Sequence, residues 1–118
     1  MPSGSSSFAR HDAVPLERVL DAAQHWAGDL RAAHAEIVRI GYFGSYARDQ
    51  YVPGSDFDVL IEVTHAPGRP RDRRDPYLPD AFPVGVELFV YATGELARLR
   101  AGGAAFIAAI DREIRWLP

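Results

Sequence analysis

The sequence predicts a single α/β domain of two layers, in which helices flank a small mixed β-sheet. Two observations predict this class: apolar runs of strand length, and longer stretches whose apolar residues recur at helical spacing. Along the chain they follow the order helix, strand, short helix, strand, loop, strand and helices. The 118 residues suffice for one modest core, and we expect the domain to span residues 13–118.

The first expected element is a helix over residues 15–35. Pro15 suits a first helical turn. Trp26 borders the apolar side of this helix and is interpreted as a packing residue, whereas His25 and His34 are interpreted as surface residues. The apolar stripe consists of Leu16, Val19, Leu20, Ala23, Ala27 and Leu30.

The first strand is expected over residues 37–43, a β-prone apolar run. Gly44 permits a sharp exit from it, and Ser45 can cap a short helix that reaches Arg48. Free N–H groups at a helix start favour anions, and the Arg48 guanidinium can add a phosphate contact. This segment is therefore a candidate phosphate site.

The second strand is expected to follow the turn at Pro53-Gly54. Its period of two places Asp56 and Asp58 on one face. Two adjacent carboxylates beside an apolar run repel each other, and burying them without a cation is costly. Mg²⁺ removes this conflict and can also hold phosphate oxygens.

The third strand is expected within residues 83–91, and Glu87 is the only charged residue in that run. Gly85 lies two residues earlier on the same face and leaves space beside the carboxylate. Taken alone, Glu87 suits a solvent-facing edge position; together with the Asp pair, it suits a metal or catalytic role.

Residues 64–81 lack regular periodicity and are interpreted as a loop, because the strand that carries Glu87 must return to the same sheet. Its arginines are read in two ways, as contacts to a triphosphate or an acidic partner, or as a solvated surface with interleaved acids. After the loop, Thr93 is expected to cap a helix through Leu99, and a second helix is expected to follow with apolar residues as far as Leu117.

Composition excludes several classes of function. The chain has no Cys and no Lys, which excludes disulfides, thiolate sites and a Lys nucleophile. A net charge of −3 argues against independent nucleic-acid binding. No run is long enough to span a membrane. The Ser- and Gly-rich tail over residues 1–12 is expected to be flexible and lacks signal-peptide features, so a cytoplasmic location is expected.

The segment from Ile40 to Val63 resembles the minimal nucleotidyltransferases of the DNA polymerase β superfamily. The pair Gly44-Ser45 is followed by ten residues and then by an Asp-x-Asp motif, which is the signature spacing of that family. The resemblance extends over residues 83–91 and a closing helix, and so over most of the chain beyond the tail.

The resemblance implies a metal-dependent transfer of a nucleoside monophosphate, AMP from ATP being the expected case. The implied roles are metal and catalytic residues Asp56, Asp58 and Glu87, and nucleotide-binding residues Gly44, Ser45 and Arg48, with Mg²⁺ or Mn²⁺ as cofactor. The third acid in the family is commonly Asp, so the longer Glu87 leaves open a poorly catalytic site. Asp49 stands where the family often has Gly and is interpreted as a surface residue.

Relatives of this kind often act as antitoxins that pair with a HEPN-domain ribonuclease toxin and adenylylate it. The resemblance therefore implies a protein partner with an acceptor hydroxyl, since the chain looks too small to carry its own acceptor-binding domain. The alternative is a non-catalytic nucleotide-binding antitoxin or adaptor that neutralises its partner by contact. An aminoglycoside-modifying or RNA-tailing enzyme is a weaker third reading.

Overall fold

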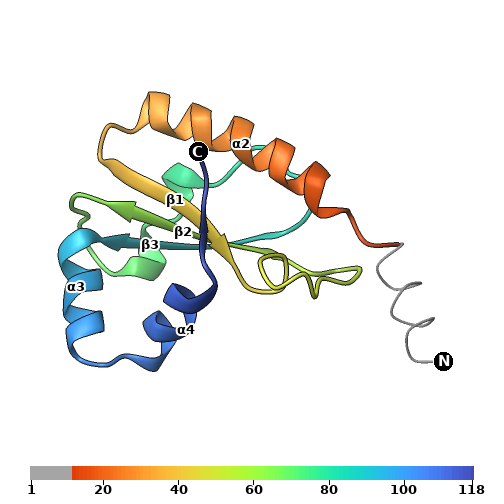
Figure 1. Ribbon diagram of the computed structural model, residues 1–118. Helices are drawn as coiled ribbons and strands as arrows, with labels where there is room; N and C mark the ends of the chain where they lie inside the picture. Colours follow the sequence, from red (N-terminus) through yellow and green to blue (C-terminus); the bar gives the residue numbers. More distant parts are fainter. Residues whose placement is uncertain (1–11) are drawn as a thin grey trace.

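A computed structural model describes residues 12–118, and the expected flexible tail lies almost wholly outside them. Four strands form one sheet: β1 (Ile37–Phe43), β2 (Phe57–Val63), β3 (Val86–Ala92) and β4 (Arg115–Trp116). Their order in the sheet is β3-β2-β1-β4, and Figure 1 labels β1, β2 and β3. The β1–β2 and β1–β4 pairs are antiparallel, whereas β2 and β3 run parallel. The predicted α/β class, with a small mixed sheet flanked by helices, is confirmed. The helices are α2 (Leu16–Ala33), α3 (Thr93–Ala101) and α4 (Ala105–Glu113).

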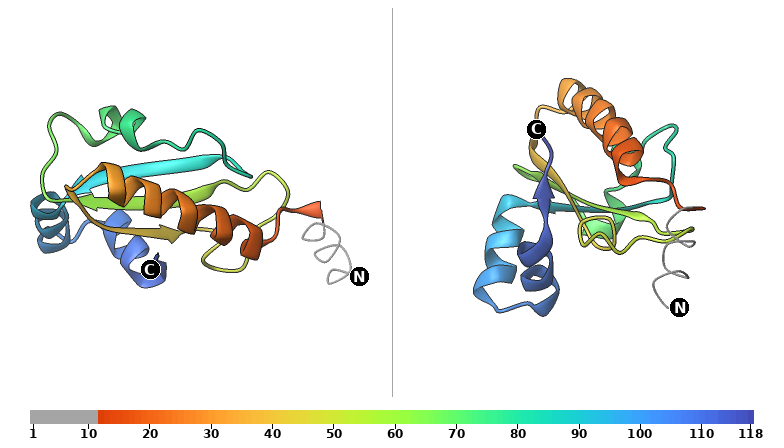
Figure 2. Two further views of the ribbon diagram at one scale, coloured as in Figure 1. Left: turned by 90° about the horizontal axis from the view of Figure 1, so that it is seen from above. Right: turned by 45° about the vertical axis from the view of Figure 1, so that its right-hand side comes forward.

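Helices cover both faces of the sheet (Figure 2). Because side chains alternate along a strand, Phe57, Val59 and Ile61 of β2 join the core cluster under α2. Leu60 lies on the other face and packs with Leu96 of α3 and residues of α4. Asp58 shares that second face, so the carboxylates are carried on the side of α3 and α4.

The expected short helix after β1 is wrong: residues 44–49 form a turn. The Arg48 N–H donates to the Gly44 carbonyl at 3.0 Å, and the Gln50 N–H donates to the Ser45 carbonyl at 2.8 Å. The chain then turns through Asp49, whose φ is 60°. This left-handed residue ends the helical path after one turn, so no helix N-terminus is built here.

The C-terminal segment also differs from its prediction. Helix α4 ends at Glu113, and Arg115–Trp116 instead form β4 beside β1. Gly41 makes this pairing feasible, because a Cβ at that position would collide with the side chains of Trp116 and Ile114. Thr93 does not cap α3 either: the helix begins at Thr93, and the Ala92 N–H is bound by Glu95 Oε1 at 2.8 Å.

The segment between β2 and β3 contains two short 3₁₀ turns, Pro70–Asp72 and Asp75–Tyr77. The second is tied to α2, because the Trp26 indole N–H donates to the Tyr77 carbonyl at 3.0 Å. Trp26 is buried, as predicted for a packing residue. Within residues 12–118, none of the helices combines the length and apolar character needed to cross a membrane.

Candidate functional site

The sheet register brings the predicted acidic residues together at one end of the sheet. Asp58 pairs with Phe43 of β1 on one side and with Glu87 of β3 on the other. Paired residues on neighbouring strands project to the same face, so the carboxylates of Asp58 and Glu87 are neighbours. Asp56 precedes β2 by one residue and lies two residues before Asp58.

Two glycines accommodate these carboxylates. A Cβ at Gly44, whose φ is 79°, would collide with Asp58 Oδ2, and a Cβ at Gly85 would collide with Asp56 Oδ1. Gly85 is held in place because its carbonyl accepts the Phe57 N–H at 2.8 Å. The space predicted beside Gly85 is therefore present, although it is occupied by Asp56 and not by Glu87.

The site carries uncompensated negative charge. Burial and, after it, the nearby charges of Asp56 and Glu87 together raise the pKa of Asp58 to about 6, although Arg48 opposes them. A carboxylate with such neighbours is stabilised by a bound cation. Yet the acids do not converge on one point: within residues 12–118, no group of three Asp, Glu or His side chains is placed to hold a metal ion.

The donor set fits a hard divalent cation in its chemistry. Such ions prefer carboxylate oxygens, and the raised pKa of Asp58 shows that the described residues leave its charge unmatched. Asp56 and Asp58 are the residues that would hold the ion. Glu87 is half-exposed, with Arg74 Nη1 at 3.9 Å from its Oε1, so it would have to turn from Arg74 toward the ion.

Arg48 forms an ion pair with Glu113, a residue that the sequence did not predict to lie near the site. Its Nη1 donates to Glu113 Oε2 at 2.9 Å and to Oε1 at 3.2 Å, and its Nε donates to Gln50 Oε1. Glu113 also raises the pKa of Asp58, so it belongs to the charge environment of the site. Glu113 ends α4, and no local pattern in the sequence links it to a turn 65 residues earlier.

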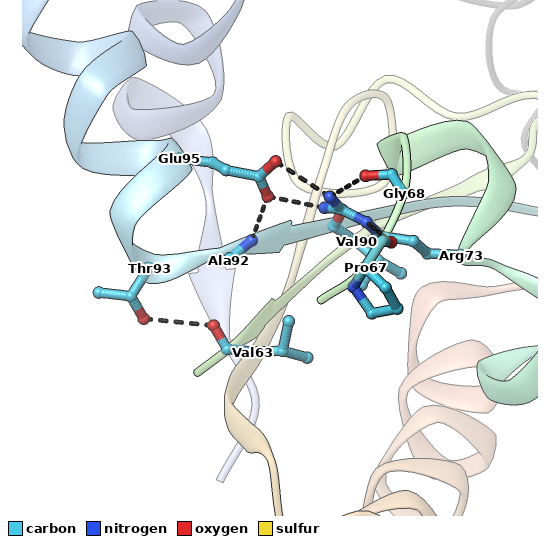
Figure 3. Close-up of polar contacts among 8 residues, drawn as sticks. All are labelled: Val63, Pro67, Gly68, Arg73, Val90, Ala92, Thr93 and Glu95. Carbon is cyan, nitrogen blue, oxygen red and sulfur yellow. Dashed lines mark hydrogen bonds and ion pairs between the residues drawn. The ribbon is translucent and has the colours of Figure 1, made fainter. Parts of the chain in front are cut away.

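The Arg-rich loop is anchored by Arg73 and is not uniformly solvated. Arg73 is 8% exposed and its guanidinium binds Glu95 at 2.6 and 3.0 Å (Figure 3). The same group donates to the carbonyls of Pro67, Gly68 and Val90. Glu95 in turn accepts the Ala92 N–H. We call this set of contacts the Arg73 clamp; it fixes the loop against β3 and the start of α3.

The comparisons with known proteins agree with this geometry. The family model described as "Nucleotidyltransferase domain" matches residues 27–100, which is more than half of the chain, and the protein belongs to this family. The fold is similar to the crystal structure of a candidate nucleotidyltransferase from Sulfolobus solfataricus. That match has a TM-score of 0.57 and 23% identity, and covers 70% of this chain and 75% of that one. No match was found among curated proteins.

Proposed function

We propose that the protein is a metal-dependent nucleotidyltransferase that transfers AMP from ATP to a hydroxyl group of a partner protein. The observation that carries the proposal is the parallel register that sets Asp58 beside Glu87, with Asp56 two residues away. Membership of the nucleotidyltransferase domain family supports the reaction class. A HEPN-type toxin as the acceptor, and an antitoxin role with it, are proposed on the motif resemblance alone.

In the proposed reaction, Gly44 and Ser45 lie against the phosphates through their main chain. Asp56 and Asp58 would hold a divalent cation, which would supply positive charge to offset that of the triphosphate and of the leaving pyrophosphate. Glu87 accepts the proton of the attacking hydroxyl at a carboxylate oxygen. The hydroxyl oxygen bonds to the α-phosphorus as the bond from that phosphorus to the α,β-bridging oxygen breaks.

Arg48 would act in this scheme after a change of partner. In the structure it pairs with Glu113 beside Asp58, and its side chain is 48% exposed. An exposed ion pair of this kind is weak, whereas a guanidinium bound to phosphate gains charge-assisted hydrogen bonds. We therefore assign Arg48 to the triphosphate when nucleotide is bound.

The experiment that tests the proposal follows label from α-phosphate-labelled ATP to the co-purified partner with Mg²⁺ or Mn²⁺. We expect the partner to become labelled, and Asp58→Asn to abolish labelling. Asp29→Asn, an exposed residue of α2, is the matched control and should retain it. Nucleotide binding without label transfer at any metal concentration would defeat the enzymatic proposal.

The second candidate is a non-catalytic adaptor that binds nucleotide and neutralises its partner by contact. The observation that favours it is the position of Glu87, half-exposed and near Arg74 and not converging with the two aspartates. The same experiment separates the two functions. An adaptor would neutralise its partner equally well as wild type and as Asp58→Asn, whereas an enzyme would lose neutralisation with that change.

A further inference from the structure

A groove runs along β3, an edge strand of the sheet, and includes the candidate catalytic residue Glu87 in its lining. Its volume is about 430 Å³, and it is bounded by the loop on one side and by the strand on the other. We call it the β3 groove and define it by six of its lining residues. These are Arg69, Arg71 and Arg74 of the loop, and Glu87, Phe89 and Tyr91 of β3.

The strand side of the β3 groove is a row that starts at the candidate active site. Glu87, Phe89 and Tyr91 alternate along β3 and so share one face. Phe89 also packs against Phe106 of α4, with ring centroids 5.5 Å apart, and Phe106 is 45% exposed. An aromatic surface therefore leads directly to the proposed catalytic carboxylate.

The loop side of the β3 groove is basic. Arg74 lies 3.9 Å from Glu87, and Arg69 is paired with Asp72 at 3.0 Å in an exposed ion pair. Arg71 makes no hydrogen bond or ion pair with another residue in the described part of the chain. Arg69 is matched by Asp72 and Arg74 by Glu87, so Arg71 leaves the groove with a net positive charge in a protein of net charge −3.

The Arg73 clamp makes the β3 groove a preformed site. Arg73 lies between the lining arginines in sequence, and its contacts to Glu95 and to the Val90 carbonyl fix the loop against β3 (Figure 3). A wall held in place by buried contacts costs less conformational entropy when a ligand binds than a mobile loop does.

We infer that the β3 groove is the acceptor-docking site and takes an acidic, tyrosine-containing segment of the partner protein. This inference rests on the proposed function, because it places the acceptor hydroxyl at Glu87. The arginines pair with carboxylates of the segment, and the aromatic floor packs against the tyrosine ring. A nucleic acid fits less well, since one short basic wall on an acidic protein neutralises few phosphates.

The test measures binding of a fluorescein-labelled peptide in which one tyrosine is flanked by glutamates, by anisotropy and with the full chain. A second peptide carries lysines in place of the glutamates. Arg71→Glu should weaken binding of the acidic peptide about tenfold, and added salt should weaken it in wild type. Arg18→Glu reverses the same charge on α2, away from the groove, and should leave binding unchanged.

Transfer of label to the peptide is measured separately, so that the two proposals fail separately. If binding depends on Arg71 but no label reaches any acceptor, the β3 groove stands as a docking site and the proposed nucleotidyl transfer is rejected. Equal binding of both peptides, or equal effects of Arg71→Glu and Arg18→Glu, would overturn the proposal that the β3 groove is the docking site. It would also be overturned if a single-stranded oligonucleotide displaced the peptide at a lower concentration than unlabelled peptide does.

Discussion

Two carboxylates on the same face of β2, Asp58 and Glu62, have opposite electrostatic environments. Glu62 is 5% exposed and accepts hydrogen bonds from Arg39 Nε at 2.8 Å and Thr93 Oγ1 at 2.7 Å. Burial works to raise the pKa of Glu62, but these hydrogen bonds outweigh it and the pKa is lowered. Burial and acidic neighbours together raise the pKa of Asp58 to about 6.

The difference separates a structural carboxylate from a candidate functional one. Both carboxylates are withdrawn from solvent, Glu62 as a buried residue and Asp58 as a partly buried one, so burial alone does not identify the site; the neighbouring charged groups do. Glu62 has its counter-charge in Arg39, and removing Arg39 would leave the buried Glu62 carboxylate without compensation. Asp58 lies among like charges whose repulsion a bound cation would relieve, as is common at functional sites.

The largest expected effect is on activity at Asp58. Asp58→Asn should reduce the proposed AMP transfer by a factor of about 1,000 or more, because the amide keeps the shape of the side chain and removes the charge that is proposed to hold a cation. Initial rates of label transfer measure this effect. A variant that retains more than about a tenth of the wild-type rate would place Asp58 outside the site.

The second effect is on stability at Glu62. Glu62→Gln should lower the free energy of unfolding by about 2 kcal/mol, because Arg39 loses its charged partner in a nearly buried setting. This figure is below that of a fully buried pair, since the Arg39 side chain is 41% exposed. Urea titration at neutral pH measures it.

Glu87→Gln is the matched control for Glu62→Gln, with a side chain 49% exposed. It should change the free energy of unfolding by less than about 0.5 kcal/mol. Equal losses for the two variants would mean that the buried ion pair of Glu62 contributes no more to stability than the exposed ion pair of Glu87.

The pattern of the sequence predicted the strands and the motif because both are local. Apolar runs marked β1, β2 and β3, and a period of two placed Asp56 and Asp58 together. Pairing is not local: nothing in the sequence specifies that Asp58 lies opposite Glu87, or that Arg48 meets Glu113. Glu87 was predicted as a site residue from the nearby Asp pair and from the resemblance, and its approach to Arg74 depends on how the loop folds.

The errors also have physical reasons. Ile114 and Leu117 continue the apolar spacing of a helix, yet residues 115–117 bond to β1 because Gly41 leaves room for Trp116. Arg73 lies in a stretch rich in Pro and Arg that reads as solvated. Its burial depends on Glu95, 22 residues later, and on three carbonyls that become available only when the loop closes over β3.

The third effect tests the space that glycine provides at the site. Gly85→Ala should lower the rate of AMP transfer about tenfold, because the new Cβ displaces the Asp56 carboxylate. The free energy of unfolding should change by less than about 1 kcal/mol. Gly28→Ala, on α2 with open space around it, is the control and should keep full activity. Unchanged activity of Gly85→Ala would show that the position of Asp56 is not critical.

The smallest effect is the pH dependence of stability that Asp58 contributes. Its pKa is raised in the folded protein from 3.8 to about 6, so the folded state binds more protons than the unfolded state between these values. The stability associated with this group is therefore fully present below pH 4 and lost as the pH rises through 6.

The variant Asp58→Asn cannot ionise at this position and therefore escapes this loss. In metal-free buffer the variant should melt a few degrees above wild type at pH 7.5, by up to about 1 kcal/mol, and the gap should close toward pH 4. A gap of the same size at both pH values would show that the charge of Asp58 is not the cause. If added Mg²⁺ at pH 7.5 raises the melting temperature of wild type and not of the variant, the cation supplies the counter-charge that Glu62 already has in Arg39.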